Sequence, residues 1–395
     1  MQSTIINTNK LRDLLENMIR IPSINPSSLN LGLSHQGTGE AKLATYIAAY
    51  MEKLGIEVQY ERLDENRANV IGIWKGTGGG RSIMLNGHMD TVGIEHMKIE
   101  PFTPEFKDGK IFGRGAGDMK GGIASQIMAV QSLIEAGKRL RGDVLLTFVA
   151  DEEYGSIGTE SVLKSYSADA AIVCEPTGLD IVIAHKGFAW IDVEVFGRAV
   201  HGSKPEEGID AIAKAGKILV EVERLGEEIL PQKTHPLLGS PSIHASLIQG
   251  GSDLSTYPGY CKIQLERRNL PGEDMPAISE EIQNLLSEIG SQDSKFKAES
   301  DVFSYRPAFE ISREQPIIQS LSRSYISNCG EQPQFVGESG WMDSALLDEA
   351  GIPVVCFGPA GEGFHAEIEC IDFNSMITTT EILIETMTDF CNSKK

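Results

Sequence analysis

The sequence is poor in basic residues and has no long apolar run. Its 395 residues include 35 Lys and Arg against 56 Asp and Glu, which gives a formal net charge of −21. This balance argues against nucleic acid or an anionic membrane surface as a partner, because both are polyanions that need a basic face. No apolar stretch approaches the roughly 18–20 residues that a membrane helix needs. We therefore expect neither a nucleic-acid partner nor a membrane partner.

The cysteines and the N-terminus indicate a cytoplasmic protein. The six cysteines are scattered and form no CxxC pair, so we expect most of them to be buried thiols in a reducing compartment. Residues 1–7 lack the basic n-region and apolar h-region of a secretory signal. Both observations favour the cytoplasm.

The apolar pattern predicts an α/β fold. Short, near-continuous apolar strands alternate with helical segments, and each strand is followed by acidic or histidine residues. Strands of this kind are buried on both faces, so we predict a mixed twisted sheet with helices on both faces. The strands that carry this prediction lie at residues 82–86, 144–150, 170–174 and 353–357.

The middle of the chain has a different pattern, typical of a small inserted domain. Residues 188–196 alternate strictly between apolar and polar, the mark of a half-exposed antiparallel strand. Further on, a long helix, two strands and a second helix complete a β-α-β-β-α series that predicts a ferredoxin-like α+β domain. We expect a discontinuous main domain at 1–185 and 300–395, with the insertion at 186–299.

A glycine-rich stretch at 113–122 is the most conspicuous motif. It reads as a turn that presents one carboxylate, Asp118, where a helix begins near Met119. Taken alone, a structural turn with Asp118 as helix N-cap explains it equally well. The glycine order is not GxGxxG, which argues against a dinucleotide fingerprint.

Two further pairs of polar residues follow apolar strands. His88 and Asp90 are two residues apart, so in an extended segment both side chains lie on one side and Asp90 can hold the His88 ring. Glu152 and Glu153 are neighbours and point apart, so one can bind a metal while the other faces a substrate as a proton shuttle. The alternatives are a polar turn pair at 88–90 and a solvated pair of charges at 152–153.

Glu175 and His365 extend this set, although each is a weak signal alone. In open α/β sheets, ligands bind beyond the carboxyl ends of the strands. Acids and histidines gathered there form a nitrogen and oxygen site of the kind that zinc accepts, and cobalt and manganese accept the same ligands. Two metals bridged by one carboxylate would clamp a water and polarise a carbonyl.

The motifs together resemble a known family of enzymes. They follow the order of the di-zinc metallopeptidase and deacylase family that contains acetylornithine deacetylase, succinyl-diaminopimelate desuccinylase, aminoacylase and carboxypeptidase G. The resemblance spans nearly the whole chain. It rests on GHMD at 87–90, GRGAGDMKGG at 113–122, ADEEYGSIG at 150–158, CEPT at 174–177, GRAVHGSKPEEGIDAI at 197–212 and FGPAGEGFHAEIE at 357–369.

The resemblance implies a zinc-peptidase-like catalytic domain with two metal ions per chain. His88, Asp118 and Glu175 would bind one zinc ion. Asp118, Glu153 and His365 would bind the other, so that Asp118 is the bridge. Cobalt or manganese ions would be able to substitute.

The resemblance also implies roles around the metals. Glu152 would be the general base, Asp90 would orient His88, and His201 of the inserted domain would stabilise the oxyanion, often across a dimer interface. Arg268 would bind a substrate carboxylate. Many relatives carry asparagine where this chain has Ser255, a departure that leaves the substrate open.

The expected function is hydrolysis of an amide by a zinc-bound water. We expect a deacylase that acts on a small N-acyl amino acid or similar amine, in a homodimer formed through the inserted lid domain. Glutamate at 175 is associated in the family with deacylases and carboxypeptidases. The alternatives are a carboxypeptidase, dipeptidase or aminopeptidase of the same family, and a non-catalytic metal-containing protein that binds small molecules.

Overall fold

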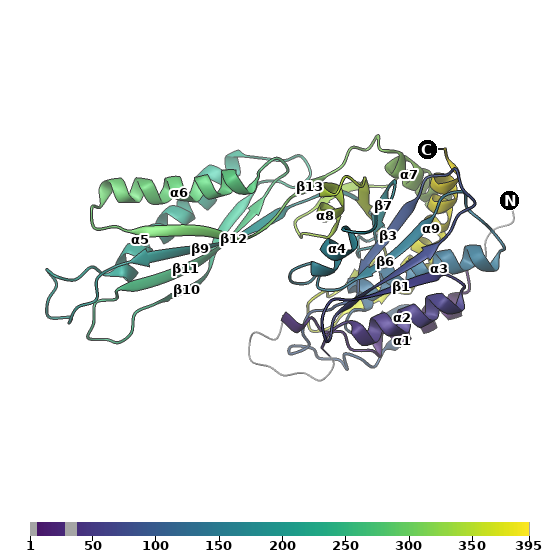
Figure 1. Ribbon diagram of the computed structural model, residues 1–395, viewed down its shortest axis with the longest axis horizontal. Coiled ribbons are helices and arrows are strands. Elements are labelled where there is room, and N and C mark those ends of the chain that lie inside the picture. The colour runs from purple at the N-terminus through teal and green to yellow at the C-terminus, as the bar shows by residue number, and fades with distance from the viewer. Residues whose placement is uncertain (1–5, 28–37, 395) are drawn as a thin grey trace. The chain divides into compact units, whose positions relative to one another are not determined.

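The computed structural model describes residues 6–27 and 38–394, which form two compact units (Figure 1). The first unit contains the chain up to Ile183, then Ile311–Val336, then the chain from Met342 onward. The second contains Ala184–Glu310 and Gly337–Trp341. The prediction that residues 1–7 carry no secretory signal falls partly on residues 1–5, which lie outside the described residues.

A mixed sheet forms the centre of the first unit. Four neighbouring strands are parallel, and the strands on either side of them pair antiparallel. The carboxyl ends of the parallel strands therefore meet at one edge of the sheet. The order is β1 (Glu57–Arg62), β2 (Ala68–Trp74), β6 (Val144–Val149), β3 (Ile83–His88), β7 (Ala171–Val173), β15 (Val354–Cys356) and β8 (Ile181–His185).

Helices cover both faces of this sheet, as β2 demonstrates. Ile71 packs with Val162 of α4 (Ile157–Val162), whereas the next residue, Gly72, faces Met51 of α2 (Ala41–Lys53). Successive residues of a strand point to opposite faces, so α4 and α2 lie on opposite sides. The predicted fold class is confirmed.

The other helices of the first unit bring distant parts of the sequence together. In Figure 1, α3 lies beside α9, and these two helices are in contact. Their bounds, with those of the remaining helices, are α1 (Thr8–Ile19), α3 (Gly121–Glu135), α7 (Pro316–Cys329), α8 (Ser344–Glu349) and α9 (Phe373–Asn392).

A second, smaller sheet in the first unit is not apparent from the sequence. Its order is β16 (Gly361–Glu362), β17 (Cys370–Asp372), β5 (Lys110–Phe112) and β4 (Glu105–Lys107). The pairing of β17 with β5 is antiparallel, with Cys370 opposite Phe112. It places the loop before β17 next to the glycine-rich turn after β5.

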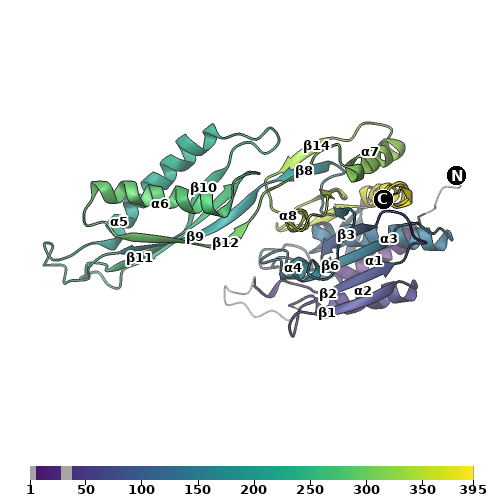
Figure 2. The same ribbon diagram turned by 45° about the horizontal axis from the view of Figure 1, so that its top comes forward.

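The second unit has the βαββαβ order of a ferredoxin-like fold. Its elements are β9 (Gly187–Phe196), α5 (Ala211–Arg224), β10 (Ser242–Gly250), β11 (Tyr260–Asn269), α6 (Met275–Gln292) and β12 (Ala298–Arg306). The antiparallel sheet has the order β10-β11-β9-β12. Figure 2 shows both helices on one side of it, where alternate residues of β9 and β11 form an apolar core with α5 and α6.

The limits of the second unit differ from the predicted insertion. The predicted end at residue 299 falls inside β12, which pairs with β9 from Ala298 to Arg306. The short strand β13 (Phe309–Glu310) then pairs with Ala184 and His185. A third segment, Gly337–Trp341, also belongs to this unit and includes the end of β14 (Phe335–Glu338). The sequence pattern could not show it, because these contacts join residues far apart in the chain.

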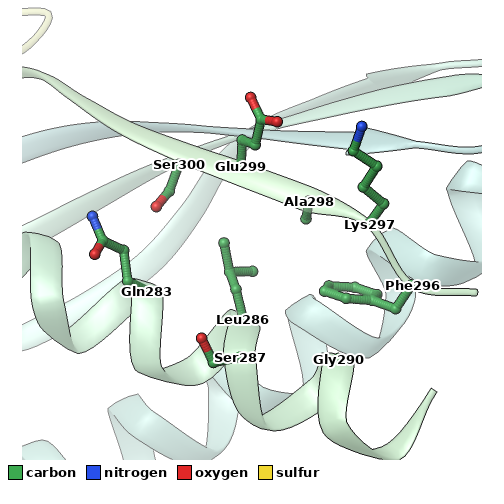
Figure 3. Close-up of a pocket in the computed structure, with 9 residues that line it drawn as sticks. All are labelled: Gln283, Leu286, Ser287, Gly290, Phe296, Lys297, Ala298, Glu299 and Ser300. Carbon is green, nitrogen blue, oxygen red and sulfur yellow. The ribbon is translucent and has the colours of Figure 1, made fainter. Parts of the chain in front are cut away.

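A surface hollow of about 600 Å³ lies between α6 and the edge strand β12 (Figure 3). Leu286 and Phe296 point into the space between helix and strand, whereas Lys297 and Glu299 turn away from it. None of the site residues predicted from the sequence lines this hollow.

The structure also bears on two predictions from composition. All six cysteines are free, and all but the partly buried Cys329 are buried. Among the described residues, no helix has both the length and the apolar character that crossing a membrane requires.

Candidate active site

The carboxyl edge of the parallel strands carries most of the predicted site residues. His88 is the last residue of β3, Glu152 and Glu153 follow β6, and Glu175 follows β7. Parallel pairing of β3 with both β6 and β7 aligns these strand ends. This alignment explains why residues almost ninety positions apart meet in space.

The glycine-rich turn delivers Asp118 to the same edge. Gly115 has φ 78°, in the left-handed region that favours glycine. At the start of α3, an added Cβ on Gly122 would lie 2.0 Å from the carbonyl oxygen of Cys174. The absence of a side chain there lets the helix begin against the end of β7, next to Glu175.

Asp118 is not the N-cap of α3, so the structural reading of this motif is wrong. The helix begins at Gly121 after Lys120, with no side-chain capping bond. The carboxylate of Asp118 instead contacts two histidines. Its Oδ1 lies 2.9 Å from Nε2 of His88, and its Oδ2 lies 3.2 Å from Nε2 of His365.

The first potential ligand group has two buried members, His88 and Glu175, and a partly buried one, Asp118. Oε1 of Glu175 lies 3.7 Å from Nε2 of His88. Burial opposes protonation of His88, but the carboxylates of Glu175, Asp118 and Glu152 outweigh it and raise the pKa of His88 well above its usual value. Burial also raises the pKa of Glu175 to about 8.

The second group shares Asp118 and is more open. Its other members are Glu153, whose Oε2 lies 3.1 Å from Nε2 of His365, and His365 itself. His365 lies in the loop between β16 and β17 and has φ 60°, an uncommon and strained value for a residue other than glycine. Hydrogen bonds to Asp118 and Glu153 raise the pKa of His365 to about 10.

These two groups fit a pair of divalent cations. In each group the potential ligand atoms lie within 4.8 Å of one another. They are imidazole nitrogens and carboxylate oxygens, a donor set that zinc, cobalt and manganese accept. The groups have the same membership that the family resemblance implies, and Asp118 is the shared residue.

Glu152 lies beside the two groups and belongs to neither. Its Oε2 is 4.0 Å from Nε2 of His88. Burial, with the nearby carboxylates of Glu175 and Asp343, raises the pKa of Glu152 well above its usual value. A carboxyl group of raised pKa next to a metal centre is suited to accept and release a proton.

Asp90 contacts the His88 ring chiefly through its main chain. Nδ1 of His88 lies 3.0 Å from the backbone oxygen of Asp90, and 3.6 Å from its carboxylate. The carboxylate accepts hydrogen bonds from the backbone N–H groups of Glu152 and Glu153, at 3.2 and 3.1 Å. Asp90 thus connects the ends of β3 and β6.

Sequence reasoning missed several buried or partly buried polar residues behind this edge. Asn25 donates to both Asp90 and Asp151, and Arg67 forms an ion pair with Asp151 at 2.9 Å. Asp343 accepts a hydrogen bond from Thr159 and has a pKa raised by burial to about 6. No short motif marks these residues, because their partners are distant in the chain.

The remaining predicted residues belong to the second unit. His201 is exposed, and its Nδ1 lies 2.8 Å from the hydroxyl of Ser203. The backbone oxygen of Ser255 accepts a hydrogen bond from Gly202, which ties the Ser255 loop to the His201 loop.

The adjacent arginines of β11 have different surroundings. Arg267 is fully buried and pairs with Glu273 and Glu281. Arg268 is partly exposed, lies over the ring of Phe188 and donates from Nε to Glu266. Of the two, Arg268 is the one with a guanidinium that reaches the surface.

Comparisons with known proteins agree with this picture. The family model described as Peptidase family M20/M25/M40 matches residues 84–389. The chain is 28% identical to N-formyl-4-amino-5-aminomethyl-2-methylpyrimidine deformylase of Halalkalibacterium halodurans, over 98% of this chain and 96% of the relative. It is 26% identical to acetylornithine deacetylase of Myxococcus xanthus, over 89% and 93%.

Solved structures show the same fold. The crystal structure of aminopeptidase PepT from Bacillus cereus has a TM-score of 0.79 and 21% identity, and the match covers 98% of this chain and 99% of that one.

Fold and site together define a metal-dependent hydrolase of amide or peptide bonds. The chain belongs to Peptidase family M20/M25/M40. The class of enzyme predicted from the sequence is confirmed.

Proposed function

We propose that this protein is a deacylase that hydrolyses the amide bond of a small N-acylated amine, with an N-acyl amino acid as the expected type of substrate. The observation that carries the proposal is the pair of ligand groups that share Asp118, with the carboxyl group of Glu152 beside them and in neither group. A pair of divalent cations, zinc by expectation, would supply Lewis-acid polarisation of the substrate carbonyl and would lower the pKa of a water.

The side chains of the chain itself would perform the proton transfers. Glu152 would take a proton from the attacking water and deliver it to the nitrogen of the leaving amine. His88 would be fixed by the main chain of Asp90, which keeps its Nε2 directed at Asp118. His201 would donate a hydrogen bond to the oxyanion, and Arg268 would pair with a substrate carboxylate.

Two relatives favour deacylation over peptide cleavage. One is a deformylase and the other an acetylornithine deacetylase, and both proteins match along most of their length. The similarity to PepT concerns the fold alone, because the sequence identity is low. A peptidase is therefore the second candidate. We also propose the homodimer through the second unit, and the cytoplasm remains the compartment expected from the cysteines.

A substrate panel on defined metal states tests this proposal. The protein would be stripped with a chelator, reloaded with Zn²⁺, Co²⁺ or Mn²⁺, and given N-formyl, N-acetyl and N-succinyl amines, acyl amino acids and dipeptides. We expect turnover of an acylated amine only with metal. Cleavage of dipeptides alone would favour the peptidase, and two bound metals without any hydrolysis would favour a non-catalytic binding protein.

A further inference from the structure

A single buried carboxylate organises the turn that presents Asp118. Glu369 is 0% exposed and accepts hydrogen bonds from the backbone N–H groups of Gly115, Gly117 and Asp118, at 3.0, 2.9 and 3.1 Å. The side chain of Arg114 donates to it at 2.8 Å. The backbone that leads into the potential bridging ligand, up to the N–H of Asp118 itself, is therefore held by one side chain.

The same carboxylate belongs to the loop of His365. Glu369 follows His365 by four residues and ends the loop between β16 and β17. Its backbone oxygen also accepts from the N–H of Gly113, at 3.2 Å. Arg114 reaches the other side of the loop, because its guanidinium donates to the backbone oxygen of Ala366, next to His365. Glu369 and Arg114 thus join the loop to the turn at several points.

Burial of the charged pair Arg114 and Glu369 is unfavourable in itself, so a role for its geometry would explain it. Arg114 and Glu369 have side chains only 3% and 1% exposed, and charges removed from water lose most of their hydration. The nearby buried Lys120 cannot replace Arg114, since its Nζ donates to the backbone oxygens of Met18 and Ile21. Apolar side chains would pack the two loops together without fixing the direction of the Asp118 carboxylate.

We propose that Glu369 and Arg114 are a positioning pair, which holds Asp118 and His365 at the separation that the second metal group requires. This inference rests on the proposed metal centre. Neither residue belongs to a potential ligand group, and the proposal gives them no part in the chemistry itself. Their effect would pass through the two ligands that they orient.

The substitution Glu369→Gln tests the pair. The glutamine is almost the same size, but its NH₂ group would face N–H donors, so at least one of the four hydrogen bonds would be lost. The matched control is Glu367→Gln in the same loop. Glu367 is exposed and forms an ion pair with Lys98 at the surface. Both substitutions remove one negative charge.

The readout is the affinity of each variant for Co²⁺ and Zn²⁺, measured by competition with a chromophoric chelator, together with thermal unfolding of the metal-free protein. We expect Glu369→Gln to bind the metal of the second group about 10–100-fold less tightly than the wild type does. This is the range typical of residues that orient ligands. We expect Glu367→Gln to stay within twofold of the wild type. A purely structural role would lower the melting temperature of the metal-free protein and leave both affinities unchanged, and that result would overturn the proposal.

A second variant keeps the test decisive if Glu369→Gln does not fold. Arg114→Lys retains the charge but cannot donate to Glu369 and Ala366 in the fork geometry of a guanidinium. It should also weaken the second metal by tenfold or more, and unchanged affinity in the folded variant would contradict the inference. Failure of the proposed function looks different, because the wild type itself would then bind no metal or would bind two metals and hydrolyse nothing.

Discussion

Oδ1 of Asp118 lies 2.9 Å from Nε2 of His88, which joins the turn before α3 to the end of β3. Although burial would raise the pKa of Asp118, hydrogen bonds from His365 and His88 outweigh it and lower that pKa well below its usual value. Asp118 therefore stays ionised at neutral pH. An ionised carboxylate between two imidazole rings is the one residue that both ligand groups share.

Removal of that charge should empty both groups. We expect Asp118→Asn to lose both metals and to lower kcat/KM about a thousandfold or more, since Asp118 is the residue that the two ligand groups share. The matched control is Asp108→Asn, because Asp108 is exposed and has φ 52°, which asparagine also adopts. Metal analysis of the dialysed proteins measures the effect. Retention of both metals by Asp118→Asn would refute its bridging role.

The neighbours Glu152 and Glu153 should separate metal binding from proton transfer. We expect Glu152→Gln to keep both metals and to lose about 10²–10⁴-fold in kcat, the range of general acid–base catalysis. Glu153→Gln, one residue away, should lose metal instead, because Glu153, unlike Glu152, contacts His365 and belongs to the second ligand group. Parallel metal analysis and steady-state kinetics distinguish the two. Equal metal loss in both variants would contradict the assignment.

Glu40 gives the metal-free protein an unusual dependence on pH. It is 0% exposed, and neither carboxylate oxygen has a hydrogen-bond partner among the described residues. Burial, then the nearby charge of Asp90, raises the pKa of Glu40 from 4.5 to about 9, with Asp151 adding to the effect and Arg67 opposing it. The folded protein therefore binds a proton that the unfolded chain releases. The stabilisation that this proton gives to the folded state is complete below pH 4.5 and is lost as pH rises toward 9.

Glu40→Gln should remove that pH dependence. We expect the variant to be close to the wild type at pH 5 and more stable than the wild type at pH 8.5, because glutamine is neutral in both states. Denaturant unfolding of metal-free protein at the two pH values measures this, with Glu52→Gln on the exposed face of α2 as the control. A variant that is less stable at pH 8.5 than at pH 5, by the same margin as the wild type, would show that Glu40 is already ionised.

Substitutions of the two adjacent arginines of β11 should change different properties, namely stability for Arg267 and substrate binding for Arg268. Arg267→Met leaves Glu273 and Glu281 without a buried partner, so we expect a loss of about 3–5 kcal/mol in the free energy of unfolding. Arg268→Lys should leave unfolding within about 1 kcal/mol, because the pair with Glu266 is partly exposed. It should raise KM about tenfold for substrates with a carboxylate. An unchanged KM would remove Arg268 from the substrate site.

Local patterns were sufficient to predict the main elements of the fold. Buried strands such as β6 and β3 appear in the sequence as continuous apolar runs, and β9 appears as an alternating one. The small sheet of β4, β5, β16 and β17 was not predicted, because strands of two or three residues have too little pattern. The predicted end of the second unit came too early for a related reason. The end of β12 is set by its pairing with β9, which the local sequence does not show.

The residues of the site could be predicted only where a motif carried them. His88, Asp118, Glu153, Glu175 and His365 stand in motifs whose order resembles a family, and the structure brings them together. Glu40 and Asp343 stand in no such motif, and only the folded chain shows that both are buried and that the charge of Asp90 acts on both. Arg114 and Glu369 lie inside quoted motifs, but their contact spans 255 residues and has no local signal.

The small sheet has a consequence for biosynthesis. A ribosome makes the chain from the N-terminus, so His88, Asp118, Glu153 and Glu175 are all synthesised long before His365 and Glu369. Strand β17 must exist before it can pair with β5 and align the 363–369 loop with the glycine-rich turn. A nascent chain would thus expose a partial set of carboxylates, and capture of the second ion would have to wait until translation has passed β17.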